Sequence, residues 1–203
     1  MHEQKVARPQ WPIHDVLARR WSTRAFDGAP LAPGTLRSLF EAARWSPSSF
    51  NEQPWRFIVA PRQDADTFAR AVGTLTPGNR LWAANAAALI FGVVTPALAR
   101  TGQENMHAYY DLGGAVAMLT VEATSRGVFV HQMAGMDREA VRELYDVPPS
   151  FDVVIALAVG RRGDAAELDA ASLRKERAER IRRDQSDFVF ARHFGEAWPE
   201  DEG

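Results

Sequence analysis

The sequence predicts an α/β fold: one domain with a central mixed β-sheet flanked by helices. Helical and strand patterns alternate along the chain, which favours helices packed on the faces of a sheet. Two continuous apolar runs, Ala86–Val94 and Val153–Gly160, are typical of strands buried on both faces. The 203 residues contain no repeat or interdomain linker, and this length suits a single domain over 1–203.

In the first half of the chain, apolar spacing predicts three helices and two strands. The first helix spans 13–20, and a turn region rich in glycine and proline follows over 28–34. The second helix spans 35–45, with an apolar face and with Pro47 as its stop. The remaining elements are a strand over Arg56–Ala60, a helix over 64–75 and the buried strand Ala86–Val94.

The second half begins with the longest helical pattern, 104–125, which Gly127 ends. Small and apolar residues form one row along it, which suits close packing against another helix: Met106, Tyr110, Gly113, Ala117, Thr120 and Ala123. The elements expected after it are a strand over Val128–His131, a helix over 138–145 capped by Asp137, the strand Val153–Gly160, and a helix from a Ser172 cap to about 183.

Composition excludes several classes of protein. Twenty-four basic residues face 26 acidic ones, so the chain lacks the basic excess typical of nucleic-acid binders. There is no cysteine, which excludes disulfides, cysteine-ligated metals and thiol chemistry. The start of the chain carries no apolar signal core, and the longest apolar stretch is shorter than the ~20 residues that span a bilayer. We therefore expect a cytoplasmic protein with no membrane or nucleic-acid partner and no metal.

The pentapeptide Arg20–Arg24 is the first candidate site. Two arginines flank a pair of hydroxyl residues, and guanidinium groups with short hydroxyl donors can hold a phosphate. The alternative is a solvated turn around a buried Trp21.

The segment Trp45–Trp55 is the second candidate site, between a helix and a strand. It is dense in polar side chains and framed by two prolines, so it could present amides and hydroxyls to a heteroaromatic ring. The alternative is a capped turn from helix to strand.

Together these segments resemble two motifs of the nitroreductase family. The first stands here as RWSTRAFD, 20–27, and the second as SPSSFNEQPW, 46–55. The resemblance implies a three-layer nitroreductase-like fold and a homodimer with two FMN sites at the subunit interface. It also implies that a C-terminal arm, 185–203, wraps the partner, whereas residues 1–11 are expected to be flexible.

The same resemblance assigns the residues that bind the cofactor. Arg20, Ser22 and Arg24, with Trp21 between them, hold the ribityl phosphate and the polar face of the flavin. The ring is bordered from the other subunit by the second motif, through Pro47, Ser48, Ser49 and Asn51, with Gln53 in the same loop.

Three further segments complete the implied site. The turn of Met133, Ala134 and Gly135 gives a backbone amide to flavin N5, so no side chain is assigned a catalytic role. Asn79 contacts the edge of the ring, and Arg180 and Arg182 close on the phosphate. His131 is either a substrate contact or a histidine at the end of a strand.

The implied activity is transfer of hydride from NADH or NADPH through FMN to a small acceptor, such as a nitroaromatic or a quinone, by a ping-pong scheme. The alternatives are a specialised reductase of an enal or semialdehyde and a non-catalytic flavin-binding module. The chain departs from better-known members at Trp21, where they have a smaller or polar residue. It also has a short connection over 95–107, where larger members carry a helical insertion that covers the site.

Overall fold

The computed structural model describes residues 5–199, and its centre is a four-stranded sheet in the order β1-β2-β4-β3. The strands are β1 Trp55–Pro61, β2 Ala88–Val94, β3 Phe129–Met133 and β4 Asp152–Gly160. Every residue of β2 is buried, as its unbroken apolar run predicts. Gly92 in β2 permits a close approach of β4, because a Cβ there would lie 2.7 Å from the Ile155 side chain.

The sheet is antiparallel throughout, so the prediction of a mixed sheet is wrong for the described residues. All three strand pairs run in opposite directions. The strands β2 and β3 run in the same direction and would pair in parallel as neighbours, but β4 lies between them. Alternation of helices and strands along the chain does not reveal which strands become neighbours, and that order decides the pairing.

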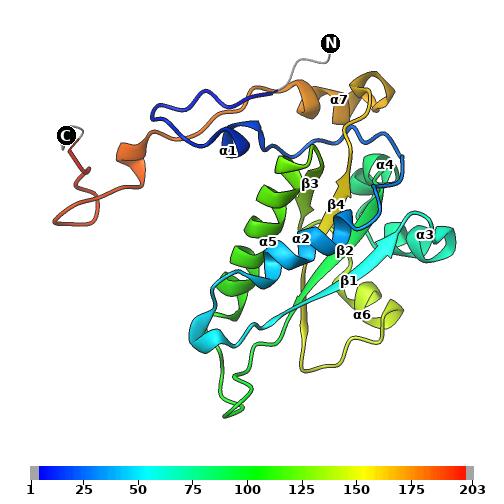
Figure 1. Ribbon diagram of the computed structural model, residues 1–203, viewed down its shortest axis with the longest axis horizontal. Helices are drawn as coiled ribbons and strands as arrows, with labels where there is room; N and C mark the ends of the chain where they lie inside the picture. Colours follow the sequence, from blue (N-terminus) through cyan, green and yellow to red (C-terminus); the bar gives the residue numbers. More distant parts are fainter. Residues whose placement is uncertain (1–4, 200–203) are drawn as a thin grey trace.

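Helices cover both faces of the sheet, which gives three layers (Figure 1). One face carries α2 (Thr35–Arg44) and α5 (Ala108–Ser125), packed on Ile90, Val94 and Leu157. The other face carries α3 (Ala65–Gly73), α4 (Pro77–Ala83) and α6 (Arg138–Leu144), packed on Leu89, Phe91 and Val93. Alternate residues of β2 therefore serve opposite cores, as the two-residue period of a strand requires.

Most predicted helices are present, with changes at their ends. The first, α1, is limited to Asp15–Arg19, and α5 begins at Ala108, because Asn105 is held in a turn by the Pro96 carbonyl. The α4 helix was not predicted; Pro77 starts it, but Gly78 weakens its helical signal. As predicted, Asp137 caps α6.

The last helix, α7, differs from its prediction at both ends. It spans Ala170–Arg177, and Asp169 caps it by accepting from the backbone N–H of Ala171 and Ser172. Ser172 is itself buried inside the helix, so it is not the cap. The helix ends at Arg177, which places Arg180 and Arg182 in an irregular segment instead of a helix.

The long helix α5 exposes an apolar face. Four members of the predicted small-residue row are exposed: Met106, Tyr110, Gly113 and Ala117. Thr120 and Ala123 are buried, because successive steps of three residues rotate the row toward the sheet. Met118 is also exposed on the outer side. A helix that is apolar on both sides is typical of one buried between two bodies.

The two ends of the chain run side by side away from the sheet (Figure 1). Gln10 donates to the Asp184 carboxylate at 2.7 Å, and Arg180 donates to the Lys5 carbonyl at 2.7 Å. Residues 1–4 and 200–203, which belong to the predicted flexible start and C-terminal arm, lie outside the described residues. None of the helices within 5–199 is long and apolar enough to cross a membrane.

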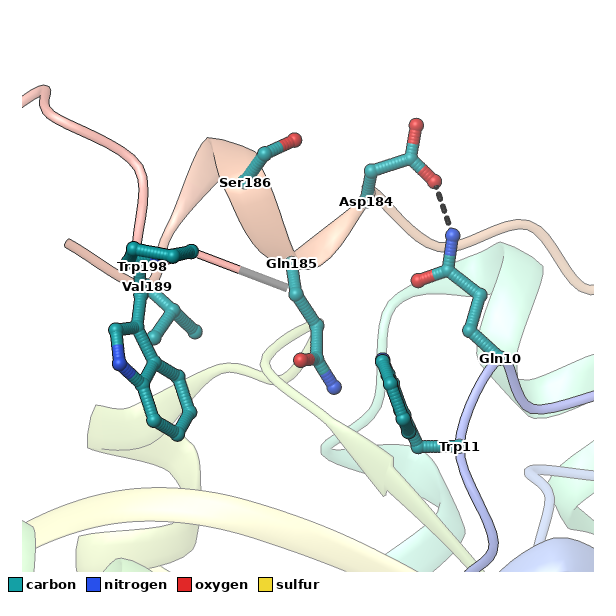
Figure 2. A pocket seen from close by; sticks show the side chains of 8 residues that line it. Gln10, Trp11, Asp184, Gln185, Ser186, Val189 and Trp198 are labelled. Atoms are coloured by element: carbon teal, nitrogen blue, oxygen red, sulfur yellow. Dashed lines mark hydrogen bonds between the residues drawn. The ribbon is translucent and has the colours of Figure 1, made fainter. Parts of the chain in front are cut away.

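Residues of both ends line a hollow of about 630 Å³. Figure 2 shows Gln185, from the short 3-10 helix η3 (Gln185–Asp187), between the rings of Trp11 and Trp198. These rings are 53% and 50% exposed. Phe188 and Phe194 in the same C-terminal segment are also exposed. The described part of the aromatic tail therefore remains largely uncovered by its own chain.

Candidate flavin site

The first motif, residues 20–27, is an extended segment that follows α1 and crosses the end of the sheet. Trp21 is buried and packs edge-on against Phe129 at 6.4 Å between ring centroids. Phe26 stacks on Trp82 at 6.3 Å and forms a β-bridge with Arg162. Two buried aromatic residues therefore anchor the motif beside the start of β3.

Three arginines gather at this motif. Burial lowers the pKa of Arg20, and the nearby charges of Arg180 and Arg182 lower it further. The pKa of Arg180 is lowered by burial and by Arg182. Among residues 5–199, no carboxylate forms an ion pair with any of the three. An anion bound between them would relieve the repulsion, so this donor set fits a phosphate group.

A buried carboxylate forms hydrogen bonds with the middle of the motif. Glu176, in the last turn of α7, is 2% exposed. Its Oε1 accepts from the Thr23 hydroxyl at 2.7 Å, and its Oε2 accepts from the Arg24 backbone N–H at 2.8 Å. Thr23, one of the two hydroxyl residues of the first candidate site, is fully buried and donates to Glu176 instead of facing a phosphate. Glu176 was not predicted, because it stands in a charged run that is typical of a solvated helix face.

The Arg24 side chain lies beside the aromatic anchors of the motif. Its guanidinium carbon is 5.7 Å from the centroid of the Trp82 ring. Burial lowers the pKa of Arg24, and the charge of Glu176 opposes this shift. Ser22, next to it, is half-buried. Arg24 is thus a partly desolvated cation that lies over the Trp82 ring.

His131 supports the same segment from β3. Its Nδ1–H donates to the Thr23 carbonyl oxygen at 2.9 Å, and its ring lies 4.4 Å from the Trp82 ring. Burial lowers the pKa of His131 from 6.5 to about 4, against the opposing effect of the bond to Thr23. The neutral, buried ring favours the structural alternative for His131 over a substrate contact.

The turn at the end of β3 meets α4. Asn79 donates to the Gly135 carbonyl at 3.0 Å, so two predicted site residues are in direct contact. A Cβ at Gly135 would lie 2.6 Å from the Asn79 side-chain nitrogen, so a larger residue there would displace the Asn79 amide. Met133 is buried, whereas Ala134 is exposed. Within residues 5–199, the backbone N–H groups of Ala134 and Gly135 donate no hydrogen bond.

The second motif forms a tight loop around the short 3-10 helix η1, Ser49–Asn51. Ser48 Oγ accepts from the Gln53 backbone N–H at 3.1 Å. Three residues that are not glycine, Phe50, Asn51 and Gln53, have positive φ of 52°, 56° and 48°. Positive φ is uncommon for residues other than glycine, above all for Phe and Gln, and such backbone is concentrated at functional sites.

This loop is tied to the start of α5. The Asp111 carboxylate, buried in the first turn, accepts from the Ser49 backbone N–H at 3.1 Å. The short 95–107 connection lies against the same loop, since Glu52 accepts from the Ala99 N–H at 2.8 Å. Pro47, Asn51 and the 86%-exposed Phe50 face solvent.

The two motifs lie at opposite ends of α5 (Figure 1). The second motif contacts its first turn, and Trp21 of the first motif contacts Phe129, which follows its last turn. A helix of 18 residues is about 27 Å long. A single chain therefore keeps the predicted halves of the site apart. It brings Arg20 near Arg180 and Arg182, and it places Arg24 over Trp82 of α4, the helix that also carries Asn79.

Comparison with known protein families shows which family carries both motifs. The model of the nitroreductase family matches residues 17–161. The chain belongs to the nitroreductase family. The matched part includes both motifs and the turn at Gly135, whereas Glu176 and the arginines at 180 and 182 lie beyond it.

Relatives and solved structures agree with this membership. The chain is 35% identical, over 69% of its length and 97% of the relative, to an uncharacterized 15.4 kDa protein of Mycolicibacterium smegmatis. It is 29% identical to a crystal structure of an oxidoreductase containing FMN, with a TM-score of 0.87 over 96% of this chain and 98% of that one. A nitroreductase family protein of Streptococcus pneumoniae shares the fold, with 18% identity and a TM-score of 0.68 over 88% and 98% of the two chains.

These matches confirm the predicted nitroreductase-like α/β fold, apart from the mixed sheet, and the resemblance seen in the two motifs. The nitroreductase fold here consists of the antiparallel sheet between its two helical layers. The similarity to the oxidoreductase containing FMN extends over almost the whole chain, so it includes the segment that carries Arg180 and Arg182. Among residues 5–199, no group of three or more His, Cys, Asp or Glu residues is placed to hold a metal ion.

Proposed function

We propose that this nitroreductase family member is an FMN-dependent oxidoreductase that uses NADH or NADPH to reduce a small acceptor, such as a nitroaromatic or a quinone. The observation that carries the proposal is the cluster of Arg20, Arg180 and Arg182, which lacks a carboxylate partner within residues 5–199. When bound, FMN supplies the redox centre that accepts hydride from the nicotinamide and passes it to the acceptor. A cytoplasmic location stays a prediction.

The residues of one chain divide into two groups around this cofactor. The three arginines and the Ser22 hydroxyl would hold the phosphate, and Arg24 would face the polar edge of the ring. The turn of Met133, Ala134 and Gly135 offers free backbone N–H groups beside Asn79, where a developing negative charge can be stabilised. The protein therefore contributes placement and electrostatics, and no side chain needs to act as nucleophile.

The second motif is supplied by a second copy of the chain in this proposal. Pro47, Ser48, Ser49 and Asn51, with Gln53 in the same loop, would border the flavin held by the other copy. Support comes from the separation of the motifs along α5 and from the exposed apolar face of that helix. The C-terminal arm, with its uncovered aromatic side chains, then wraps the partner.

An absorbance spectrum of the purified protein tests this function. We expect a flavin spectrum, release of FMN on heating, and bleaching when NADH or NADPH is added without oxygen. The comparison of the two nicotinamides also gives the preferred reductant. Absence of flavin after incubation with FMN would contradict the proposal, and binding of FMN without bleaching would identify a flavin-binding module with no turnover.

A further inference from the structure

Glu176 is placed to control the residue that faces the flavin. We propose that Glu176 is a positioning residue, which fixes Arg24 against the flavin edge and offsets part of the positive charge there. This inference rests on the proposed function, because it assigns Arg24 to the flavin.

The geometry restricts Arg24 from two directions. The two carboxylate oxygens of Glu176 accept hydrogen bonds from adjacent residues of the motif. One accepts from the Thr23 hydroxyl at 2.7 Å and the other from the Arg24 backbone N–H at 2.8 Å. The Trp82 ring lies under the Arg24 guanidinium at 5.7 Å. The backbone and the side-chain end of Arg24 are therefore held separately. His131 adds a third restraint through the Thr23 carbonyl.

The negative charge of Glu176 also acts on the cations around Arg24. Its carboxylate is 2% exposed and lies among cations, and it opposes the lowered pKa of both Arg24 and Lys5. Interactions between buried charges are screened much less than those on the surface. Glu176 thus offsets part of the positive charge at the flavin edge. A reduced flavin carries more negative charge than an oxidised one, so this offset lowers the tendency of the flavin to accept electrons.

Replacement of Glu176 by glutamine tests its hydrogen bonds and its charge separately, because glutamine has the same shape but no charge. In Glu176→Gln, the amide oxygen can accept from the Arg24 N–H and the amide nitrogen can donate to the Thr23 oxygen. The Thr23 hydroxyl can then donate to the Ala25 carbonyl, which lies 3.3 Å away. Glu176→Ala removes both contacts. Asp169→Ala is the matched control, because it removes the cap of the same helix without touching the motif.

The experiment measures the FMN dissociation constant, from flavin fluorescence on dilution of the holoprotein, and the flavin midpoint potential. For Glu176→Ala we expect affinity to fall about tenfold or more relative to Asp169→Ala, the loss expected for a charge-assisted hydrogen bond. Glu176→Gln should recover most of that affinity and shift the midpoint potential to a more positive value than the wild type.

Two results would overturn the inference while leaving the function intact. One is equal FMN affinity in Glu176→Ala and Asp169→Ala. The other is a Glu176→Gln variant that binds FMN with the potential of the wild type, since a merely structural Glu176 would give that result. A wild-type protein that binds no FMN would instead contradict the proposed function itself.

Discussion

At the scale of single residues, the sequence identified the groups that contact the cofactor in the proposed site but not those that hold them. Arg20 and Arg24 stand in a recognisable motif; the structure places Arg20 near Arg180 and Arg182, and Arg24 over the Trp82 ring. Glu176 and Asp111 were not predicted, and Thr23 was expected to face a phosphate instead of Glu176. These residues are buried and contact residues up to 153 positions away in the sequence, and no local sequence pattern reveals such contacts.

Removal of the Arg20 guanidinium should weaken FMN binding. A lost charge-assisted bond to phosphate costs about 1.5–3 kcal/mol, or roughly tenfold or more in affinity. Flavin fluorescence titration of Arg20→Ala measures the change. Arg19→Ala is the control, because Arg19 is its neighbour but forms an ion pair with Asp15. Equal affinities of the two variants would contradict the phosphate assignment.

The buried His131 should make the protein less stable in mild acid. Its pKa in the folded protein is about 4, below the unfolded value of 6.5, so the unfolded state binds more protons between these values. The free energy of unfolding is therefore unaffected by this titration above pH 6.5. It decreases as the pH falls toward 4, by up to roughly 3 kcal/mol.

Urea unfolding at pH 7.5, 5.5 and 4.5 measures this effect in the wild type and in His131→Gln. The carboxylates titrate similarly in both proteins, so the difference between them isolates the histidine. We expect the wild type to lose more unfolding free energy than the variant between pH 7.5 and 4.5. Parallel losses in both proteins would show that His131 does not carry the pH dependence.

At the scale of helices and strands, strong apolar patterns were predicted well and weak ones were not. The strands β2 and β4 and the helix α5 follow directly from their sequences. The short α4 was not predicted, because Gly78 is typical of a turn. The helix predicted at α7 was too long, because charged residues continue past Arg177. Strand order was not predictable, since it depends on contacts distant in sequence.

The exposed face of α5 should be a subunit interface. Ala117→Glu places a charge at the centre of this face, next to the exposed Met118, without changing the buried side of the helix. Burial of an unpaired charge is costly, so we expect the variant to be monomeric at concentrations where the wild type is dimeric. Sedimentation velocity gives the two states.

The control for this variant is Ala69→Glu on α3, another alanine exposed on a helix but on the opposite side of the sheet. We expect it to sediment like the wild type. A dimeric Ala117→Glu, with the same dilution behaviour as Ala69→Glu, would place the interface elsewhere.

At the scale of the whole molecule, a single chain is incomplete in three places. The two motifs are separated by the length of α5, one face of that helix is uncovered, and aromatic side chains of the C-terminal segment are exposed. A second copy related by twofold symmetry would supply each motif to the other and cover the remaining surfaces. The sequence alone could not show the separation, because only the fold places the motifs at opposite ends.

Subunit complementation tests this shared site most directly. One chain carries Arg20→Ala and Arg24→Ala, the other carries Ser48→Ala and Asn51→Ala, and each alone should bind FMN weakly. In co-expressed mixed dimers, one of the two sites combines both unaltered motifs. Random pairing then restores tight FMN binding at about a quarter of all sites. Binding no tighter than the average of the two parent proteins would contradict a site built from two chains.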